Sequence, residues 1–347
     1  MITNFYSKIN KIEKIINNEA NSLTKGISAY IYNPDNNMSI GFASGYSDFN
    51  KKIKLKTENF FRIASVTKTF IASTILRLHE ENLLNIENSI ANYLPIHYIT
   101  LLHKGDYNSS EITIKHLLSH SSGLFDHTNT DKFNDLIKHS PNYKWSRFEQ
   151  VETCIKYGNK LNEPGKAFNY SDTGYILLGK IVEIVAELPL AEAVRKFIDF
   201  NNIDLLNTTW ESEENINRIH QYLDDNDTFS FNPSFDLYGG GGLLSNCKEL
   251  AFFFYSLFNG KVFKQSSTLT TMLSKNTYAV LPELDYRYGI FRIEVNGIEG
   301  FTHTGFWGTQ AIYFPAIKTS IAINYSEKWK IKGNAPILPK ILEIILA

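Results

Sequence analysis

Strand-like segments occur near both ends of this chain, and a long region without them lies between the two groups. Near the N-terminus, residues 27–32 and 39–45 are joined by a turn rich in Asn and Pro, which predicts a hairpin. Near the C-terminus, the strand-like segments are 286–295, which ends at the turn signal Asn296-Gly297, then 310–314 and 320–324. Because no helical crossover separates neighbouring strands in either group, we expect both groups to pair in one antiparallel sheet.

Helical spacing of apolar residues predicts the elements that pack on this sheet. An apolar stripe from Phe5 to Ile16 marks the first helix, and a dense apolar pattern after Val66 marks a buried one. The expected helices cover residues 4–25, 66–80 and 337–346. The long middle of the chain carries mostly helix and loop patterns.

The predicted fold class is therefore α+β. An antiparallel sheet is built from both chain ends and flanked by N- and C-terminal helices, and a mainly helical lobe is inserted between its halves. The predicted sheet domain combines residues 1–80 and 231–347, and the inserted domain covers residues 81–230. A cleft between two such lobes is the natural place for a site. The acidic stretch Glu211 to Glu214 is predicted to be solvated surface.

Charge and hydropathy exclude several classes of protein. The 347 residues include 35 Lys and Arg and 36 Asp and Glu, a formal net charge of −1. A nucleic-acid-binding chain normally carries a basic excess, so we expect no nucleic-acid partner. No stretch approaches the roughly 20 apolar residues that a membrane helix requires, so no membrane span is expected.

The N-terminus and the cysteines indicate a compartment. Polar residues interrupt the first ten positions, so no secretory signal is visible there. Cys154 and Cys247 belong to no metal or redox motif, and we expect two reduced, buried thiols. Together these features favour a cytoplasmic location.

Ser65 and Lys68 form the first candidate site. Three residues apart on a helix, their side chains lie on one face, so the lysine amine can reach the serine hydroxyl. A serine needs such a base to become a nucleophile, and the start of a helix favours a developing oxyanion. For Lys68 to act as that base, burial must lower its pKa enough to leave it partly neutral.

The same spacing occurs elsewhere in the chain and is therefore weak evidence alone. Ser22 and Lys25 lie at the end of the first helix, and Ser245 with Lys248 opens a later one, where Ser245 is a good N-cap. Ser65 differs from both because apolar residues precede it and a buried helix follows it.

Two later segments could complete such a site. Tyr170 lies at the junction of a loop and a helix, with Ser171 or Asp172 as the expected cap, and its phenol could shuttle a proton from serine to a leaving group. His303-Thr304-Gly305 lies between the Asn-Gly turn and the next strand, where glycine permits close approach to a substrate.

A metal site is the alternative that the histidines raise. His116 and His120 stand at helical spacing, and Asp126 and His127 follow them, but no glutamate adjoins His116 as in a zinc protease. No phosphate-binding or dinucleotide-binding loop occurs either. We expect no metal and no cofactor.

Taken in order, these segments resemble the motifs of the serine beta-lactamase and penicillin-binding-protein family, in its class C branch. The segment from Phe61 to Lys68 is similar to the nucleophile motif, and that from Ile112 to Leu124 to a middle structural motif. Further resemblances are those of 164–175 to the tyrosine motif, of 240–245 to a glycine segment and of 303–305 to the third motif. The likeness extends over about residues 26–325.

The resemblance implies a role for each matching residue. Ser65 would be the nucleophile, Lys68 its activating partner and Tyr170 the proton shuttle. The backbone N–H groups of Ser65 and Phe306 would form the oxyanion hole. Substrate binding would fall to Asp172, His303, Thr304, Gly305 and Phe306.

Two positions depart from the family pattern. Asp172 stands where asparagine is common, and a carboxylate there would favour the ammonium form of Lys68 and raise the pKa of the phenol. His303 stands where beta-lactamases of this branch usually carry lysine, so a permanent cation becomes a titrating one.

The function that follows is hydrolysis through an acyl-enzyme on Ser65. The expected substrate is a small ester, amide or peptide, as for an esterase or D-aminopeptidase. A beta-lactamase or D,D-carboxypeptidase is the alternative within enzymes, and a penicillin-recognising sensor, acylated without turnover, is the alternative of another class. The sequence leaves the oligomeric state open.

Overall fold

The computed structural model describes residues 2–213, 217–278, 283–328 and 335–347. Its centre is an antiparallel sheet that contains, within the described residues, eight strands in the order β3-β2-β1-β13-β12-β11-β10-β9. The strand from the N-terminal hairpin, β1, pairs with the last strand, β13, in the register Ile27 with Tyr325 to Tyr32 with Ser320. The strands are β1 Gly26–Asn33, β2 Met38–Asp48, β3 Ile53–Lys54, β9 Asp285–Tyr286, β10 Phe291–Val295, β11 Ile298–Gly305, β12 Thr309–Phe314 and β13 Thr319–Tyr325.

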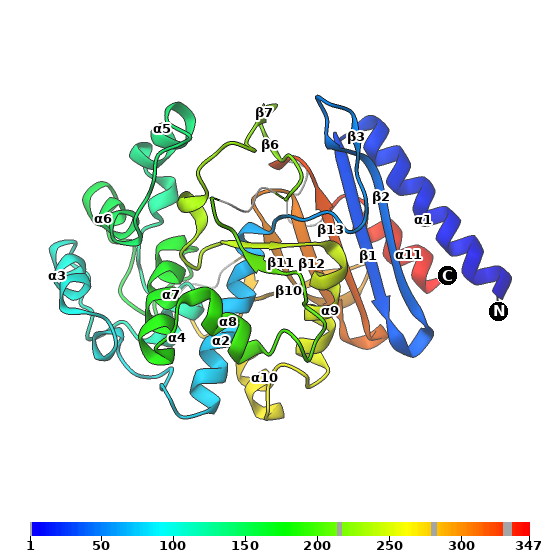
Figure 1. Cartoon of the computed structure of the whole chain (residues 1–347). Coiled ribbons are helices and arrows are strands. Elements are labelled where there is room, and N and C mark those ends of the chain that lie inside the picture. Colours follow the sequence, from blue (N-terminus) through cyan, green and yellow to red (C-terminus); the bar gives the residue numbers. More distant parts are fainter. Residues whose placement is uncertain (1, 214–216, 279–282, 329–334) are drawn as a thin grey trace.

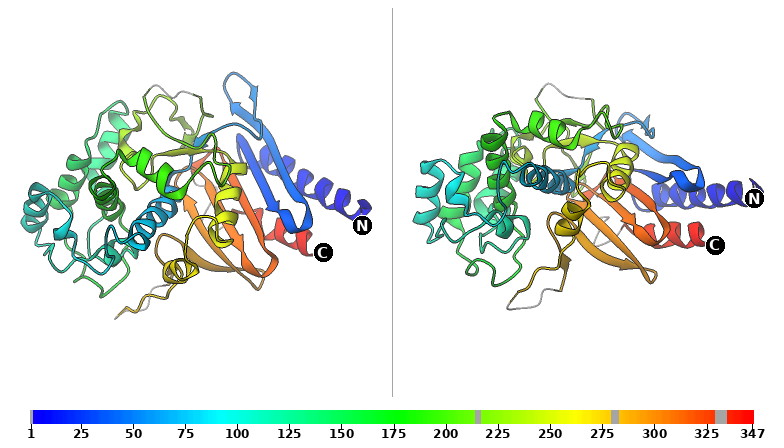
Figure 2. Two further views of the ribbon diagram at one scale, coloured as in Figure 1. Left: turned by 60° about the horizontal axis from the view of Figure 1, so that its bottom comes forward. Right: turned by 90° about the horizontal axis from the view of Figure 1, so that it is seen from below.

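Helices cover both faces of this sheet and form a lobe beside it (Figure 1). The two terminal helices, α1 and α11, lie next to each other, with α1 against β1 and β2, and both termini lie at that end of the molecule (Figures 1 and 2). The helices are α1 Ile2–Ser22, α2 Thr67–Glu80, α3 Ile96–Lys104, α4 Ile114–Leu118, α5 Asp131–His139, α6 Arg147–Tyr157, α7 Asp172–Ala186, α8 Leu190–Ile198, α9 Cys247–Phe258, α10 Ser266–Met272 and α11 Leu338–Leu346. The α+β class with a sheet from both chain ends is confirmed.

Alternation along β1 explains how the sheet separates two apolar cores. Ile27, Ala29 and Ile31 point to the face covered by α1 and α11, where Ile12 of α1 joins the same buried cluster. Tyr30 points to the opposite face, which packs on α9. Because successive strand residues face opposite sides, this period of two assigns each residue to one core.

The second core extends from the sheet into the helical lobe. Helix α2 is buried on nearly every side, and α7, α8 and α10 pack around it. Short strands between the sheet and the lobe are β4 Phe61–Arg62, β8 Leu243–Ser245 and β5 Thr209–Trp210, which pair with one another, and β6 Tyr222–Leu223 with β7 Asn226–Asp227. The segment that carries Ser65 therefore leaves β4 and enters the most buried helix. The boundaries of the two predicted domains stay a prediction.

Three local expectations differ from the structure. The strand predicted over 286–295 is two strands, because Arg287 to Ile290 form a turn in which Gly289 (φ 78°) lies against α2; a Cβ there would stand 2.2 Å from the Cβ of Ala72. Ser245 does not cap α9: the Asn246 side chain accepts the Glu249 N–H instead. The first helix ends at Ser22, three residues before the predicted boundary at 25.

Two further expectations concern the thiols and the membrane. Cys154 and Cys247 are both free and buried, as predicted. In the described part of the chain, no helix combines the length and the apolar character needed to cross a membrane.

Candidate active site

Ser65 lies in a single 3₁₀ turn, Ala64–Val66, that continues directly into α2. Ala64 has a φ of 45°, a left-handed conformation that costs energy in a residue with a Cβ. This sharp bend presents Ser65 at the N-terminal end of α2, where the helix dipole favours negative charge. Ser65 is half-buried, whereas Lys68, one turn later, is completely buried.

A buried ion pair holds the strand that leads into this bend. Nε of Arg62 donates to both carboxylate oxygens of Glu211 at 2.8 and 2.9 Å, and Arg218 donates to Glu211 Oε1 at 2.8 Å. The prediction of a solvated acidic stretch is therefore wrong for Glu211, which is 6% exposed, although it holds for Glu213. Glu214 lies outside the described residues. Two buried guanidinium groups require a counterion here. The composition of the sequence does not predict this requirement.

Lys68 is a fully engaged ammonium group. Its Nζ donates to Ser65 Oγ at 2.9 Å and to the carbonyl of Gly240 at 2.7 Å, and it forms an ion pair with Asp172. Burial alone lowers the pKa of Lys68, but the charges of Asp172 and Tyr170 and their hydrogen bonds together outweigh burial and raise that pKa above its usual value. In the resting state Lys68 is therefore an ammonium, as expected from the neighbouring Asp172. It is not the partly neutral amine that a simple base requires.

Tyr170 completes the contact with the serine. It precedes α7, and its phenol hydrogen-bonds to the side chains of both Ser65 and Lys68. Desolvation raises the pKa of Tyr170 above its usual value; Lys68 opposes this shift and Asp172 adds to it. The hydroxyl, the ammonium and the phenol thus meet at one point, with the phenol in its neutral form.

Glycines bring the segments around Lys68 close together. A Cβ on Gly239 (φ 118°) would stand 2.6 Å from the Tyr175 carbonyl, and one on Gly179 would stand 2.3 Å from the Tyr238 carbonyl. This close packing of α7 against the glycine segment allows the Gly240 carbonyl to reach Lys68.

His120 has a positioning role that the sequence reasoning missed. Its Nδ1 accepts the N–H of Ser171 at 3.1 Å, and its ring lies 4.1 Å, centroid to centroid, from that of Tyr170. Burial, with Lys68 nearby, lowers the pKa of His120 well below its usual value. A neutral histidine therefore supports the turn that presents Tyr170. The left-handed backbone of His120 (φ 53°) is the unusual feature of this position, but backbone angles cannot be derived from a single sequence.

The segment His303-Thr304-Gly305 ends β11 beside the nucleophile. A Cβ on Gly305 would stand 2.2 Å from the Ile63 carbonyl, so only glycine fits where β11 meets the strand before Ser65. Phe306 follows and is 45% exposed, whereas Thr304 is half-buried. The structure thus brings this segment to the same place as Ser65, at the end of the sheet.

His303 itself is neutral, which differs from the titrating cation expected from the sequence. Its ring is buried against Tyr286 and Phe291, and its Nδ1 contacts the Thr304 carbonyl at 2.9 Å. Burial and, next, the charge of Lys68 lower the pKa of His303 to about 3. A histidine in this environment offers an aromatic edge and a neutral nitrogen.

Other histidines and carboxylates raised the question of a metal. Within the described ranges, no group of three or more His, Cys, Asp or Glu side chains has the geometry to hold an ion. His116 instead accepts the Thr113 N–H at the start of α4. The polar groups that meet at the site are the Ser65 hydroxyl, the Lys68 ammonium, the Tyr170 phenol and the Asp172 carboxylate.

Comparison with known proteins identifies the family of this chain. The chain matches the family described as Beta-lactamase over residues 17–333 and belongs to that family. The fold and the site together define a serine hydrolase of the beta-lactamase family.

Individual relatives share only a modest part of their sequence with this chain. Protein flp of Staphylococcus aureus (strain COL) is 34% identical over 146 residues, which cover 41% of this chain and 26% of that protein. The match thus spans about a quarter of the length of this curated relative. The D-amino acid amidase of Ochrobactrum anthropi SV3, solved with D-phenylalanine, superposes with a TM-score of 0.83 at 21% identity, covering 98% of this chain and 99% of that one. EstCE1, described as a hydrolase with promiscuous acyltransferase activity, has a TM-score of 0.80 at 18% identity and covers both chains fully (100%).

Proposed function

We propose that this protein hydrolyses a small ester or amide, including a small peptide, through an acyl-enzyme on Ser65. One observation carries the proposal: Lys68 Nζ stands 2.9 Å from Ser65 Oγ, and the Tyr170 phenol bonds to the same hydroxyl. A serine held between an ammonium and a phenol at the start of a buried helix is arranged for nucleophilic catalysis.

The reaction follows from the positions of these groups. Ser65 Oγ attacks the substrate carbonyl while its proton passes to Lys68, which releases one of its own protons to a neighbouring group. The oxyanion that forms is held by the backbone N–H groups of Ser65 and Phe306, aided by the N-terminal end of α2. The Tyr170 phenol then protonates the leaving group, and water releases the acyl group from Ser65.

Neutral groups around the site favour a substrate whose reacting end carries little charge. His303 is neutral, and the rings of Tyr286, Phe291 and the exposed Phe306 supply apolar contact. The likeness to an amidase of D-amino acids and to EstCE1 supports an amide or ester substrate. Asp172 is occupied by Lys68, so we assign substrate contact first to Thr304, Gly305 and Phe306.

The family match itself supports the second candidate. Membership of a family described as Beta-lactamase favours testing a beta-lactamase or D,D-carboxypeptidase activity beside the esterase and amidase ones. A sensor that is acylated by penicillin and not turned over uses the same serine and differs only in the release step. The cytoplasmic location expected from the sequence stays a prediction.

Acylation and turnover of a chromogenic ester test the proposal. The wild type is expected to release product steadily and to carry a transient acyl group on Ser65, seen by mass spectrometry, and Ser65→Ala is expected to lose both. Ser22→Ala is the matched control, because Ser22 has the same spacing to Lys25, which pairs with Asp225 and Glu327 instead.

The other outcomes separate the candidates. A stoichiometric burst without turnover would favour the sensor, and turnover of a cephalosporin faster than of esters or D-aminoacyl amides would favour the beta-lactamase. Full activity in Ser65→Ala would refute the proposal.

A further inference from the structure

We propose that Asp172 is the group that finally accepts the Ser65 proton, and that it does so through Lys68. The inference deepens the proposed function and rests on it. As Ser65 Oγ bonds to the substrate carbonyl carbon, its O–H bond breaks and an N–H bond forms on Lys68. Lys68 passes another of its protons to Asp172, which becomes a neutral carboxylic acid. Because Asp172 acts through Lys68 and does not touch the substrate, it is a positioning residue.

The contacts of Lys68 require such a partner. An ammonium has three N–H donors, and four groups surround them here: Ser65 Oγ, the Gly240 carbonyl, the Asp172 carboxylate and the Tyr170 phenol. An ammonium has no lone pair, so Lys68 has to release a proton before it takes one from Ser65. The carbonyl is far too weak a base for that proton, which leaves Asp172 and Tyr170 as acceptors.

Tyr170 is a poorer acceptor in the resting state. Desolvation raises the pKa of its phenol, and the charge of Asp172 raises it further, so the phenol is neutral at physiological pH. The anion that balances Lys68 is therefore the Asp172 carboxylate, which is in direct contact with Nζ. The phenol keeps its proton for the leaving group.

Other titratable groups lie around Asp172. Five further titratable groups face it from the lobe, the glycine segment and the sheet: Asp126, His127, Asp236, Tyr286 and His303. Burial and, next, the charge of Asp172 raise the pKa of Asp126 and that of Asp236 to about 7.

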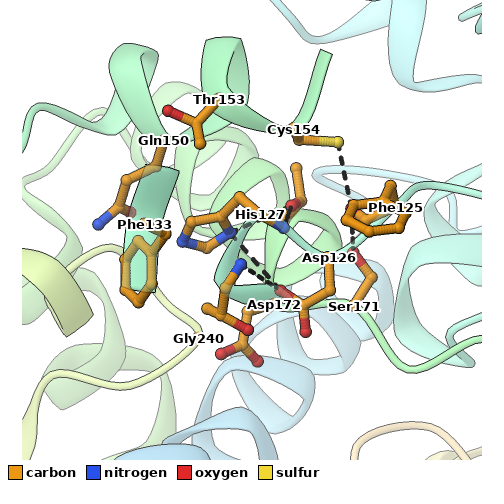
Figure 3. Close-up of polar contacts among 12 residues, drawn as sticks. Phe125, Asp126, His127, Phe133, Gln150, Thr153, Cys154, Ser171, Asp172 and Gly240 are labelled. Atoms are coloured by element: carbon orange, nitrogen blue, oxygen red, sulfur yellow. Dashed lines mark hydrogen bonds and ion pairs between the residues drawn. The ribbon is translucent and has the colours of Figure 1, made fainter. Parts of the chain in front are cut away.

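The remaining groups that face Asp172 add little charge. Burial lowers the pKa of His127 to about 4 and that of His303 to about 3, so both rings are neutral. Burial also raises the pKa of Tyr286 well above its usual value, which leaves a neutral phenol. Asp126 and His127 lie beside Asp172 (Figure 3), and Gln150 lines the same small cavity as Asp172.

Asp172 lines a small polar cavity on the side of the helical lobe. The cavity has a volume of about 10 Å³, room for roughly one water molecule, and His127, Gln150, Asp172 and Asp236 line it. Gln150 Nε2 donates to the carbonyls of Ser234 and Phe235, which fixes the orientation of its amide. In the described part of the chain Gln150 Oε1 is buried without a donor, so this cavity contains an unsatisfied acceptor.

The pH dependence of acylation tests the inference through Asp172→Asn, which keeps the shape and removes the proton-accepting charge. In this variant the phenol of Tyr170 has to ionise instead. We expect kcat/KM for the ester at pH 7 to fall by about 10²-fold or more, with the acid limb of the profile displaced to higher pH. Asp135→Asn, the same change on the exposed face of α5, is the matched control and should follow the wild type.

A measurement on the wild type removes any dependence on how the variant folds. Transfer from Ser65 to Lys68 and from Lys68 to Asp172 moves two protons, so kcat/KM in mixtures of H₂O and D₂O should curve with deuterium content. A linear dependence, or an Asp172→Asn variant with native circular dichroism and an unchanged pH profile, overturns the inference while the proposed function stands. A wild-type chain that is never acylated on Ser65 overturns both.

Discussion

The ion pair that anchors the nucleophile strand gives the sharpest prediction about stability. Glu211→Gln keeps the shape of the side chain but removes the charge that Arg62 and Arg218 share. The side chains of Arg62, Glu211 and Arg218 are only 2%, 5% and 5% exposed, so water does not replace the lost anion. Arg62 is three residues before Ser65, so the nucleophile should be affected as well.

The magnitude follows from the burial of these groups. Removing one partner of a buried pair costs about 3–5 kcal/mol of unfolding free energy, because the other charge stays buried without its counterion. Two guanidinium groups lose their counterion here, and burial together with the charge of Arg62 already lowers the pKa of Arg218 to about 10. We therefore expect a loss toward the upper end of that range.

Urea unfolding followed by far-UV circular dichroism measures this loss. Glu213→Gln is the matched control: Glu213 belongs to the same acidic stretch but pairs with Lys144 in solvent, so no measurable change is expected. An exposed ion pair contributes about 1 kcal/mol or less to stability. If the unfolding free energy of Glu211→Gln differed from that of the wild type by no more than this, the structural role assigned to Glu211 would be refuted.

Three further predictions concern the site. Tyr170→Phe should lower kcat for amide substrates by about 10²–10⁴-fold, because the leaving group loses its proton donor, and a rate equal to the wild type would exclude that role. Asp236→Asn should stabilise the protein at pH 8 but not near pH 4. The reason is that burial raises the folded pKa of Asp236 from 3.8 to about 7, so its contribution to stability is full below pH 3.8 and is lost as pH rises through 7. Urea unfolding at both pH values should show a gain of up to about 4 kcal/mol at pH 8, and a gain that is equal at both would contradict the assignment. His303→Lys should place a cation where His303 is neutral and lower KM for an acid-bearing ester about tenfold relative to its uncharged analogue; equal KM changes for the two substrates would argue against substrate contact at this position.

Much of the fold could be predicted from the chain because its signals are local. Strand alternation from Ile27 to Tyr32 and helical spacing from Ile9 to Ile16 assign residues to faces, and no crossover helix interrupts either group of strands. The sheet from both ends follows from those patterns alone. The strand break at Gly289 did not follow, because it depends on how closely this turn packs against α2.

The candidate site also has features that the sequence predicts and features that only the tertiary structure decides. Residue type and spacing made Ser65, Lys68, Tyr170 and His303 candidates, and the resemblance to a known family separated them from other residues of the same types. The ammonium form of Lys68 was expected from Asp172, but the neutral form of His303 was not. Whether a lysine is an ammonium or a histidine is neutral depends on desolvation and on neighbours that are distant in sequence, as Asp172 is from Lys68. Only the tertiary structure decides which charged groups are buried together away from solvent. The same cause makes Glu211 buried and Glu213, two residues later, exposed.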